Sequence, residues 1–175
     1  MSATRIDGVG EVSIRAVAGD HPRPESASDW DDWGDMDPAT KDMQIHRWII
    51  EVTDSAGACV TVGDLSAHAV WYGPTPGSRA LNIGISLVEE HRGRGIGAIA
   101  QRLLAEELHA AGTVRVEAST DVENIPEQRS LAKAGFVHEG TLRLAQARRD
   151  GLHDLQVWAH VRAPHADDLP HEMPN

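Results

Sequence analysis

Arginine and glycine alternate in a short segment that lies between two apolar patterns. Glycine tolerates positive φ angles and lets the backbone approach a ligand closely. A helix that begins after such a turn exposes its first N–H groups and the positive end of its dipole. With the guanidinium charges, the segment predicts an anion cradle suited to a pyrophosphate, although a tight turn whose glycines serve geometry alone is the alternative. Its residues are Arg92, Gly93, Arg94, Gly95, Ile96, Gly97 and Ala98.

The segments on either side of this turn have different periodicities. Apolar residues alternate with others over residues 81–88, which predicts a strand. From Ile96 to Ala111 the apolar residues recur at spacings of three and four, which predicts one buried face of a helix. The glycine spacing is not that of a GxGxxG fingerprint, and no Gly-Lys-Ser/Thr follows as in a P-loop.

Length and composition indicate one globular domain. The 175 residues suffice for a sizeable core, and an apolar fraction of 41% is ordinary for such a domain. The 16 Lys and Arg against 27 Asp and Glu argue against non-specific nucleic-acid binding and are compatible with an amine substrate. No apolar run approaches the ~20 residues that span a bilayer, so we expect no membrane partner.

The single cysteine, Cys59, excludes an intrachain disulfide and is expected to be a small buried core residue rather than a catalytic thiol. The first residues are polar and lack the apolar core of a signal peptide. We therefore expect a cytoplasmic protein made in a reducing compartment.

The remaining patterns predict an α+β, or mixed α/β, domain around one twisted sheet. We expect residues 1–10 to be a flexible N-terminus, residues 11–162 a single domain, and the proline-rich residues 163–175 a disordered tail. The expected strands are 11–18, 45–53, 58–71, 81–88, 113–119, 136–144 and 153–162, and the expected helices are 96–111 and 125–134.

A stretch rich in Asp, Pro and Trp, residues 19–42, interrupts this order after the first strand. Its prolines keep any helix short. It is either a solvated acidic loop or a mobile flap whose carboxylates and indoles hold a cation.

A second motif follows the strand at 113–119. It consists of Asp121-x-x-Asn124, a short helix, Lys133-Ala134-Gly135-Phe136, and Glu139-Gly140. Together with Arg92-x-x-Gly95-x-Gly97, this pattern resembles the acyl-CoA signature and late motif of the GCN5-related N-acetyltransferases, the GNAT superfamily. The match covers residues 81–162, with a weaker one over residues 11–18. The further pattern of Arg143, Asp154 and Arg162 resembles the branch that acetylates ribosomal-protein N-termini.

The resemblance implies a mostly antiparallel sheet of about seven strands, flanked by helices, in which the fourth and fifth strands splay apart. It implies acetyl-CoA as cosubstrate, no metal, and direct acetyl transfer to the primary amine of a small molecule or a peptide N-terminus. Because dimers are common in the family, a homodimer stays open. The alternative is a non-catalytic CoA-binding or regulatory module of the same fold.

The resemblance also assigns roles to backbone groups. The fourth strand, at Ile85, Ser86 and Leu87, would pair with the pantetheine arm, and the N–H of Ile85 would stabilise the thioester oxyanion. The pyrophosphate would lie on the turn from Gly93 to Ala98. Asn124 would touch the pantetheine or the substrate, unless it is simply a helix cap.

Several side chains are candidates for the proton transfers. Glu117 is the first candidate for base, although it also fits an ordinary residue on the polar face of a strand. The acid of the family's alanine N-acetyltransferase branch is a Tyr that matches Leu131, and a related branch has Ser where this chain has Glu127. Tyr72 and Ser130 remain as hydroxyl candidates, and proximity with solvent-mediated proton transfer is the alternative.

Aromatic and imidazole side chains are candidates for the substrate wall. Indoles are more often core residues than site residues, so each assignment competes with a packing role. The candidates, besides Tyr72, are Trp30, Trp33, His68 and Trp71.

Overall fold

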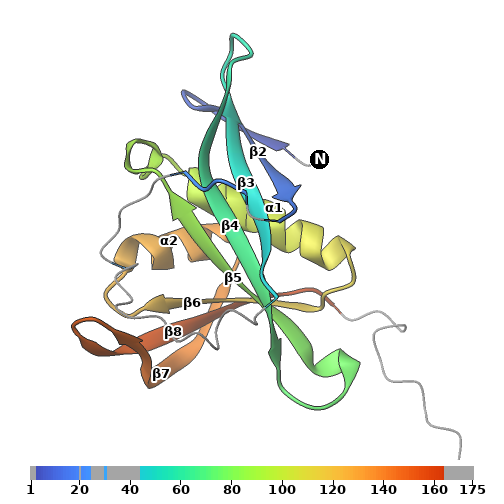
Figure 1. Cartoon of the computed structure of the whole chain (residues 1–175), viewed down its shortest axis with the longest axis vertical. Coiled ribbons are helices and arrows are strands. Elements are labelled where there is room, and N and C mark those ends of the chain that lie inside the picture. Colours follow the sequence, from blue (N-terminus) through green and yellow to red (C-terminus); the bar gives the residue numbers. More distant parts are fainter. Residues whose placement is uncertain (1–2, 20, 25–29, 31–43, 164–175) are drawn as a thin grey trace, which may run out of the picture.

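The computed structural model describes residues 3–19, 21–24, 30 and 44–163, which form one open eight-stranded sheet with two α-helices (Figure 1). The strands lie in the order β1-β2-β3-β4-β5-β6-β8-β7. Only the β5–β6 pair is parallel, so the predicted mixed, mostly antiparallel sheet is confirmed. The elements are β1 (Ala3–Ile6), β2 (Gly10–Val17), β3 (His46–Thr53), β4 (Cys59–Trp71), β5 (Arg79–Leu87), α1 (Ile96–Ala110), β6 (Arg115–Asp121), α2 (Ile125–Ala134), β7 (Val137–Arg148) and β8 (Gly151–Val161).

The additional strand, β1, lies in the segment expected to be a flexible terminus. It pairs antiparallel with β2, from Ala3 opposite Ser13 to Ile6 opposite Gly10. Gly10 permits a close approach here, because a Cβ at this position would lie 2.4 Å from the carbonyl oxygen of Thr53. The described part of the chain therefore has eight strands rather than about seven.

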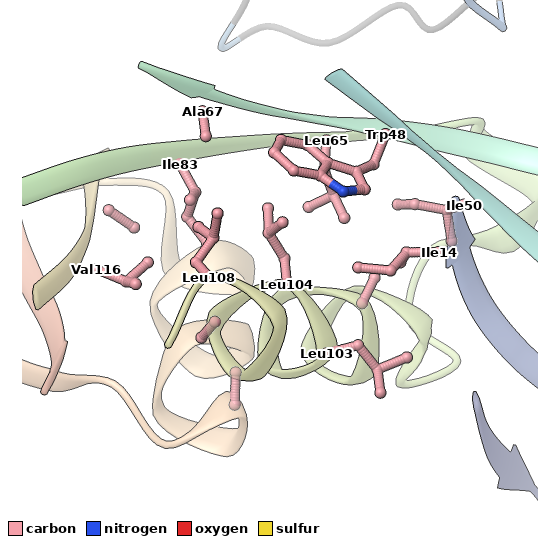
Figure 2. Close-up of a cluster of buried hydrophobic side chains, with 14 of the residues drawn as sticks. Ile14, Trp48, Ile50, Leu65, Ala67, Ile83, Leu103, Leu104, Leu108 and Val116 are labelled. Atoms are coloured by element: carbon pink, nitrogen blue, oxygen red, sulfur yellow. The ribbon is translucent and has the colours of Figure 1, made fainter. Parts of the chain in front are cut away.

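The main core lies between α1 and one face of the sheet (Figure 2). Leu104 and Leu108 of α1 point toward the sheet, which contributes Trp48, Leu65 and Ile83, as the helical spacing predicts. The indole N–H of Trp48 donates to the Glu107 carboxylate of α1 at 2.8 Å, so this buried polar atom is satisfied.

The second motif of the sequence frames α2. Asn124 caps its first turn, and Pro126 lies in that turn, where its missing N–H costs nothing. Gly135 ends the helix in the left-handed conformation, and Phe136 then enters the core at 3% exposure. The predicted helix at 125–134 is thus confirmed, and it packs against α1, β6 and β7.

Two expectations outside the site differ from the structure or lie beyond it. Cys59 is exposed at the start of β4, so the expectation of a buried core residue is wrong. Of the expected tail, residues 164–175 lie outside the described residues. No helix in the described ranges is both long and apolar enough to cross a membrane.

We expect Leu104→Ala to lower the free energy of unfolding by about 2–5 kcal/mol, because it leaves a cavity between α1 and the sheet. Leu104 is 0% exposed. The matched control is Leu142→Ala on β7, where the side chain is 52% exposed and the cost should stay near 0.5 kcal/mol or less. Urea unfolding measures both variants. Equal midpoints for the two would contradict the described core.

Candidate active site

The central feature of the site is a gap between β5 and β6. The two strands pair only at Leu81–Val116, Asn82–Glu117 and Ile83–Ala118. Beyond these pairs β5 continues to Leu87 beside β4, and β6 continues to Asp121 beside β8, so the strands diverge (Figure 1). The predicted splay is therefore present.

Ile85, Ser86 and Leu87 all lie on the unpaired part of β5. Among the described residues, no strand pairs with this part on the β6 side. Backbone N–H and C=O groups that face such a gap need partners, and an extended ligand can supply them as an added strand does.

The glycine-rich turn lies at the end of this gap. Gly95 is the N-cap of α1, with φ of 82°, and it makes no side-chain capping hydrogen bond. The N–H groups of Ile96, Gly97 and Ala98 belong to the first helical turn, which has no intrahelical acceptors for them. These groups and the positive end of the helix dipole are suited to an anion, and the role of this turn as an anion cradle stays a prediction.

The two arginines of the turn are held by backbone carbonyls. Arg92 donates from Nε to the carbonyl oxygen of Leu87 at 2.9 Å, which ties the turn to the end of β5. Arg94 donates to the carbonyl oxygen of Gly8 at 3.5 Å, beside β1. Arg92 therefore braces the cradle as well as adding positive charge to it.

Gly97 is the point at which α1, α2 and β5 meet. A Cβ at this position would lie 3.1 Å from the Ser130 hydroxyl, 3.5 Å from Leu87 Cδ1 and 3.6 Å from Ile85 Cδ1. A larger residue would fill the space next to the unpaired strand. This close approach explains the third glycine of the turn in addition to any ligand contact.

A buried polar network extends from this point between the two helices. The Ser130 hydroxyl donates to Oε1 of Gln101 at 2.8 Å, and Nε2 of Gln101 donates to the Glu127 carboxyl. Gln101 is only 1% exposed. Burial raises the pKa of Glu127 to about 7, although the hydrogen bond from Gln101 acts in the opposite direction.

Sequence reasoning missed Glu127. The available signals were its position, three residues after Asn124, and the polar Gln101 on an otherwise apolar helix face. Neither signal reveals burial, which results from the packing of α1 on α2.

Glu117 and Tyr72 lie together on the other face of the sheet. Val116 and Ala118 point into the core, so Glu117 between them points away from the helices. Its side chain is nearly inaccessible at 2% exposure, and the Tyr72 hydroxyl donates to its Oε2 at 2.9 Å. Two of the three candidate catalytic residues are thus adjacent, whereas Ser130 lies on the helix side.

Arg115 completes this group. Its guanidinium pairs with Glu117 and with the exposed Glu139, and it lies 5.8 Å from the centre of the Tyr72 ring. Burial and then the Glu117 carboxylate raise the pKa of Tyr72, so its phenol is protonated at neutral pH. Beside Tyr72 and Arg115 lies a hollow of about 420 Å³, which residues 77–80, at the start of β5 and just before it, also line.

His68 belongs to the same face as Glu117. The registers place it opposite Asn82, which in turn lies opposite Glu117, so the three form one row across β4, β5 and β6. Burial lowers the pKa of His68, which keeps its imidazole neutral at neutral pH.

The expected aromatic wall is only partly assembled. Trp71 is 56% exposed and, by strand alternation, points to the face opposite His68. Trp30 stacks on Arg148, with 5.5 Å between the guanidinium carbon and the ring centre, rather than in the His68 row. Trp33 lies outside the described residues.

Asn124 and Asp121 have structural partners in the loop before α2. The side-chain Oδ1 of Asn124 accepts the N–H of Glu127 at 3.3 Å, which is the capping role considered for it. Asp121 is 1% exposed and accepts from the Glu123 N–H and from Nδ1 of His153, at 2.8 and 2.7 Å. Contact of Asn124 with a ligand stays a prediction.

No group of three or more His, Cys, Asp or Glu side chains in the described ranges could hold a metal ion. The groups assembled at the gap are hydrogen-bond donors, a protonatable carboxyl and a buried carboxylate. This set suits acyl transfer between an extended anionic donor and an amine.

Comparison with known proteins agrees with this geometry. A family model described as an acetyltransferase (GNAT) domain matches residues 9–137. RimJ of Mycobacterium smegmatis, solved with CoA-disulfide, is 25% identical, with a TM-score of 0.57, over 73% of this chain and 56% of its own. RimL, a ribosomal L7/L12 alpha-N-protein acetyltransferase solved with coenzyme A, is 22% identical, with a TM-score of 0.57, over 67% of this chain and 62% of its own.

A third similar structure is the microcin C7 self-immunity acetyltransferase MccE, in complex with acetyl-CoA and AMP. It is 20% identical, with a TM-score of 0.56, over 68% of this chain and 62% of its own. The matched part of this chain therefore spans less than two thirds of each of these three proteins. No curated protein matches the sequence.

We expect Gly95→Glu to weaken CoA binding at least about 100-fold, because a carboxylate would replace an open position at the N-terminus of α1. The matched control is Gly57→Glu in the β3–β4 turn. Gly57 has a similar φ of 87°, so the backbone strain is alike, and a Cβ there would meet nothing within 4 Å, whereas one at Gly95 would meet only Ile6 Cδ1 at 3.9 Å. Isothermal titration with CoA measures both variants. Unchanged affinity in Gly95→Glu would place the cradle elsewhere.

Proposed function

Because the chain belongs to the GNAT acetyltransferase family, we propose that it transfers an acetyl group from acetyl-CoA directly to a primary amine. The observation that carries this proposal is the gap between β5 and β6, which ends at the uncapped N-terminus of α1. Coenzyme A has two chemically different parts. The unpaired strand edge suits its amide-bearing arm, and the helix N-terminus at the end of that edge suits its pyrophosphate.

The residues present fit this cosubstrate. The backbone of Ile85, Ser86 and Leu87 would pair with the pantetheine arm, and the N–H of Ile85 would donate to the developing oxyanion. The turn from Gly93 to Ala98 would hold the pyrophosphate. When bound, acetyl-CoA supplies the acetyl group as an activated thioester, and the fold supplies its orientation beside the amine.

The acceptor amine would enter from the face that carries Glu117. An ordinary ammonium must lose a proton before it can attack a carbonyl carbon. Glu117 is the proposed base, and Arg115 and Tyr72 hold its carboxylate at a fixed position. The neutral imidazole of His68 lies two strands away in the same row and can take part in moving the proton to solvent.

The chemical class of the acceptor is proposed as a peptide N-terminus, with a small-molecule amine as the alternative. The late motif and the similarity in fold to RimJ and RimL support the peptide amine. The second candidate function is a CoA-binding module without catalysis. This non-catalytic module is supported by Leu131, which is fully buried at the position where one branch of the family has the Tyr that donates the proton. We also propose a cytoplasmic location, in keeping with the single cysteine.

We expect acetyl-CoA-dependent release of free thiol when the protein is given amines, with peptide N-termini preferred over polyamines. A thiol-release assay across an amine panel, run beside CoA titration, separates the candidates. Tight CoA binding without thiol release from any amine would favour the non-catalytic module. Absence of CoA binding would overturn the whole proposal.

We expect Glu117→Gln to lower kcat/KM at neutral pH by about 10²–10⁴-fold while CoA affinity stays the same, because the base is lost and the shape is kept. The control is Glu139→Gln, which removes the other carboxylate partner of Arg115 at an exposed position and should change kcat/KM less than about tenfold. An unaltered pH–rate profile in Glu117→Gln would remove Glu117 as the base.

A further inference from the structure

Glu127 is a partly buried carboxyl group that the proposed reaction has not yet used. It lies in the first turn of α2, which begins four residues after the end of β6, and its own N–H is capped by Asn124. Across from it, Gln101 lies one helical turn after Gly97 on α1. Gly97 in turn adjoins Ile85 and Leu87, the residues of the unpaired strand edge.

The hydrogen bonds around Glu127 fix which of its oxygens can carry a proton. Ser130 donates its hydroxyl to Oε1 of Gln101, so the amide nitrogen of Gln101 points at Glu127. That nitrogen donates to Oε1 of Glu127, so Oε1 is an acceptor. Oε2 is therefore the oxygen available for a proton.

The surroundings of Glu127 favour its protonated form. Burial raises its pKa to about 7, and the hydrogen bond from Gln101 opposes this only in part. Of the charged groups on the neighbouring elements, Asp121 binds His153 and Arg102 of α1 binds Glu106. No cation among the described residues pairs with Glu127 to keep it ionised.

We propose that Glu127 is the general acid that protonates the departing thiolate of coenzyme A, with Gln101 and Ser130 as positioning residues. This inference rests on the acetyl transfer proposed above. Attack of the amine forms a bond between nitrogen and the acetyl carbon, and the bond from that carbon to sulfur breaks. Sulfur keeps the electron pair and takes the proton of Glu127. The resulting carboxylate regains a proton through solvent from the acylated nitrogen, so the protons balance.

The other candidates are less suited to this step. Leu131 has no proton to give. The Tyr72 hydroxyl donates to Glu117 on the opposite face of the sheet, away from the helices. The Ser130 hydroxyl donates to Gln101, which makes it a support for the acid rather than the acid itself.

The test is the pH dependence of kcat at saturating acetyl-CoA and saturating amine. In the wild type we expect kcat to fall as pH rises through about 7, because a general acid must be protonated to act. In Glu127→Gln this falling limb should be absent and kcat should decrease about 10²-fold, with CoA affinity unchanged. The control Glu123→Gln makes the same change of residue type at an exposed side chain four residues away, and it should keep both the falling limb and kcat.

A second variant separates proton donation from a structural role. Gln101→Met keeps the volume but removes the donor that lowers the pKa of Glu127, so the falling limb should move to higher pH. Infrared difference spectra should show a protonated carboxyl near pH 6 that is absent from Glu127→Gln.

The outcomes separate the two proposals. Acetyl transfer by the wild type with an unchanged pH profile in Glu127→Gln would overturn the role of Glu127 and leave the proposed function standing. Absence of any protonated carboxyl band near pH 6 from the wild-type infrared spectra would also overturn that role, even if Glu127→Gln fails to fold. Absence of acetyl transfer by the wild type would overturn both proposals.

Discussion

The structure depends on the point at which β5 and β6 stop pairing. Up to Ile83 and Ala118 the two strands share a parallel ladder, and beyond it each keeps only its outer neighbour. Buried backbone groups are almost always paired in folded proteins, so an open edge inside a sheet is unusual and needs water or a ligand. Because the crossover from β5 leads directly into α1, the helix N-terminus also lies at the end of this open edge. The interruption of pairing between β5 and β6 therefore accounts for both the open strand edge and the helix N-terminus that lies at its end.

The sheet also separates two carboxyl groups that have opposite surroundings. Glu117, on the face away from the helices, pairs with Arg115 and accepts a hydrogen bond from the Tyr72 hydroxyl. Glu127, between the helices, has only a neutral amide and is driven toward its protonated form by burial. Two carboxyls whose environments differ in this way can serve as base and acid at one pH. The gap between β5 and β6 lies between the two faces, where the acetyl group would have to be.

Local patterns predicted most of the fold, whereas the parts that depend on tertiary contacts were missed. The turn at Gly95 and the stop at Gly135 are local backbone requirements, so sequence predicted both helices well. β1 was missed because its four residues show no alternation of apolar and polar side chains. They form a strand by pairing with β2. Strand register decides that His68 joins the Glu117 row and that Trp71 does not, and the sequence alone does not determine register.

The motif that carried the family resemblance has largely a framing role in the structure. Asp121 binds the loop N–H of Glu123, Asn124 caps α2, and Phe136 fills the core directly after Gly135 ends the helix. These residues determine where α2 lies against α1, and so where any residue of its first turn meets the gap. None of these contacts uses the side chain of residue 127, so the frame does not determine which proton donor stands there. This explains how the sequence can indicate a coenzyme A cradle clearly and yet give little information about the proton donor within it.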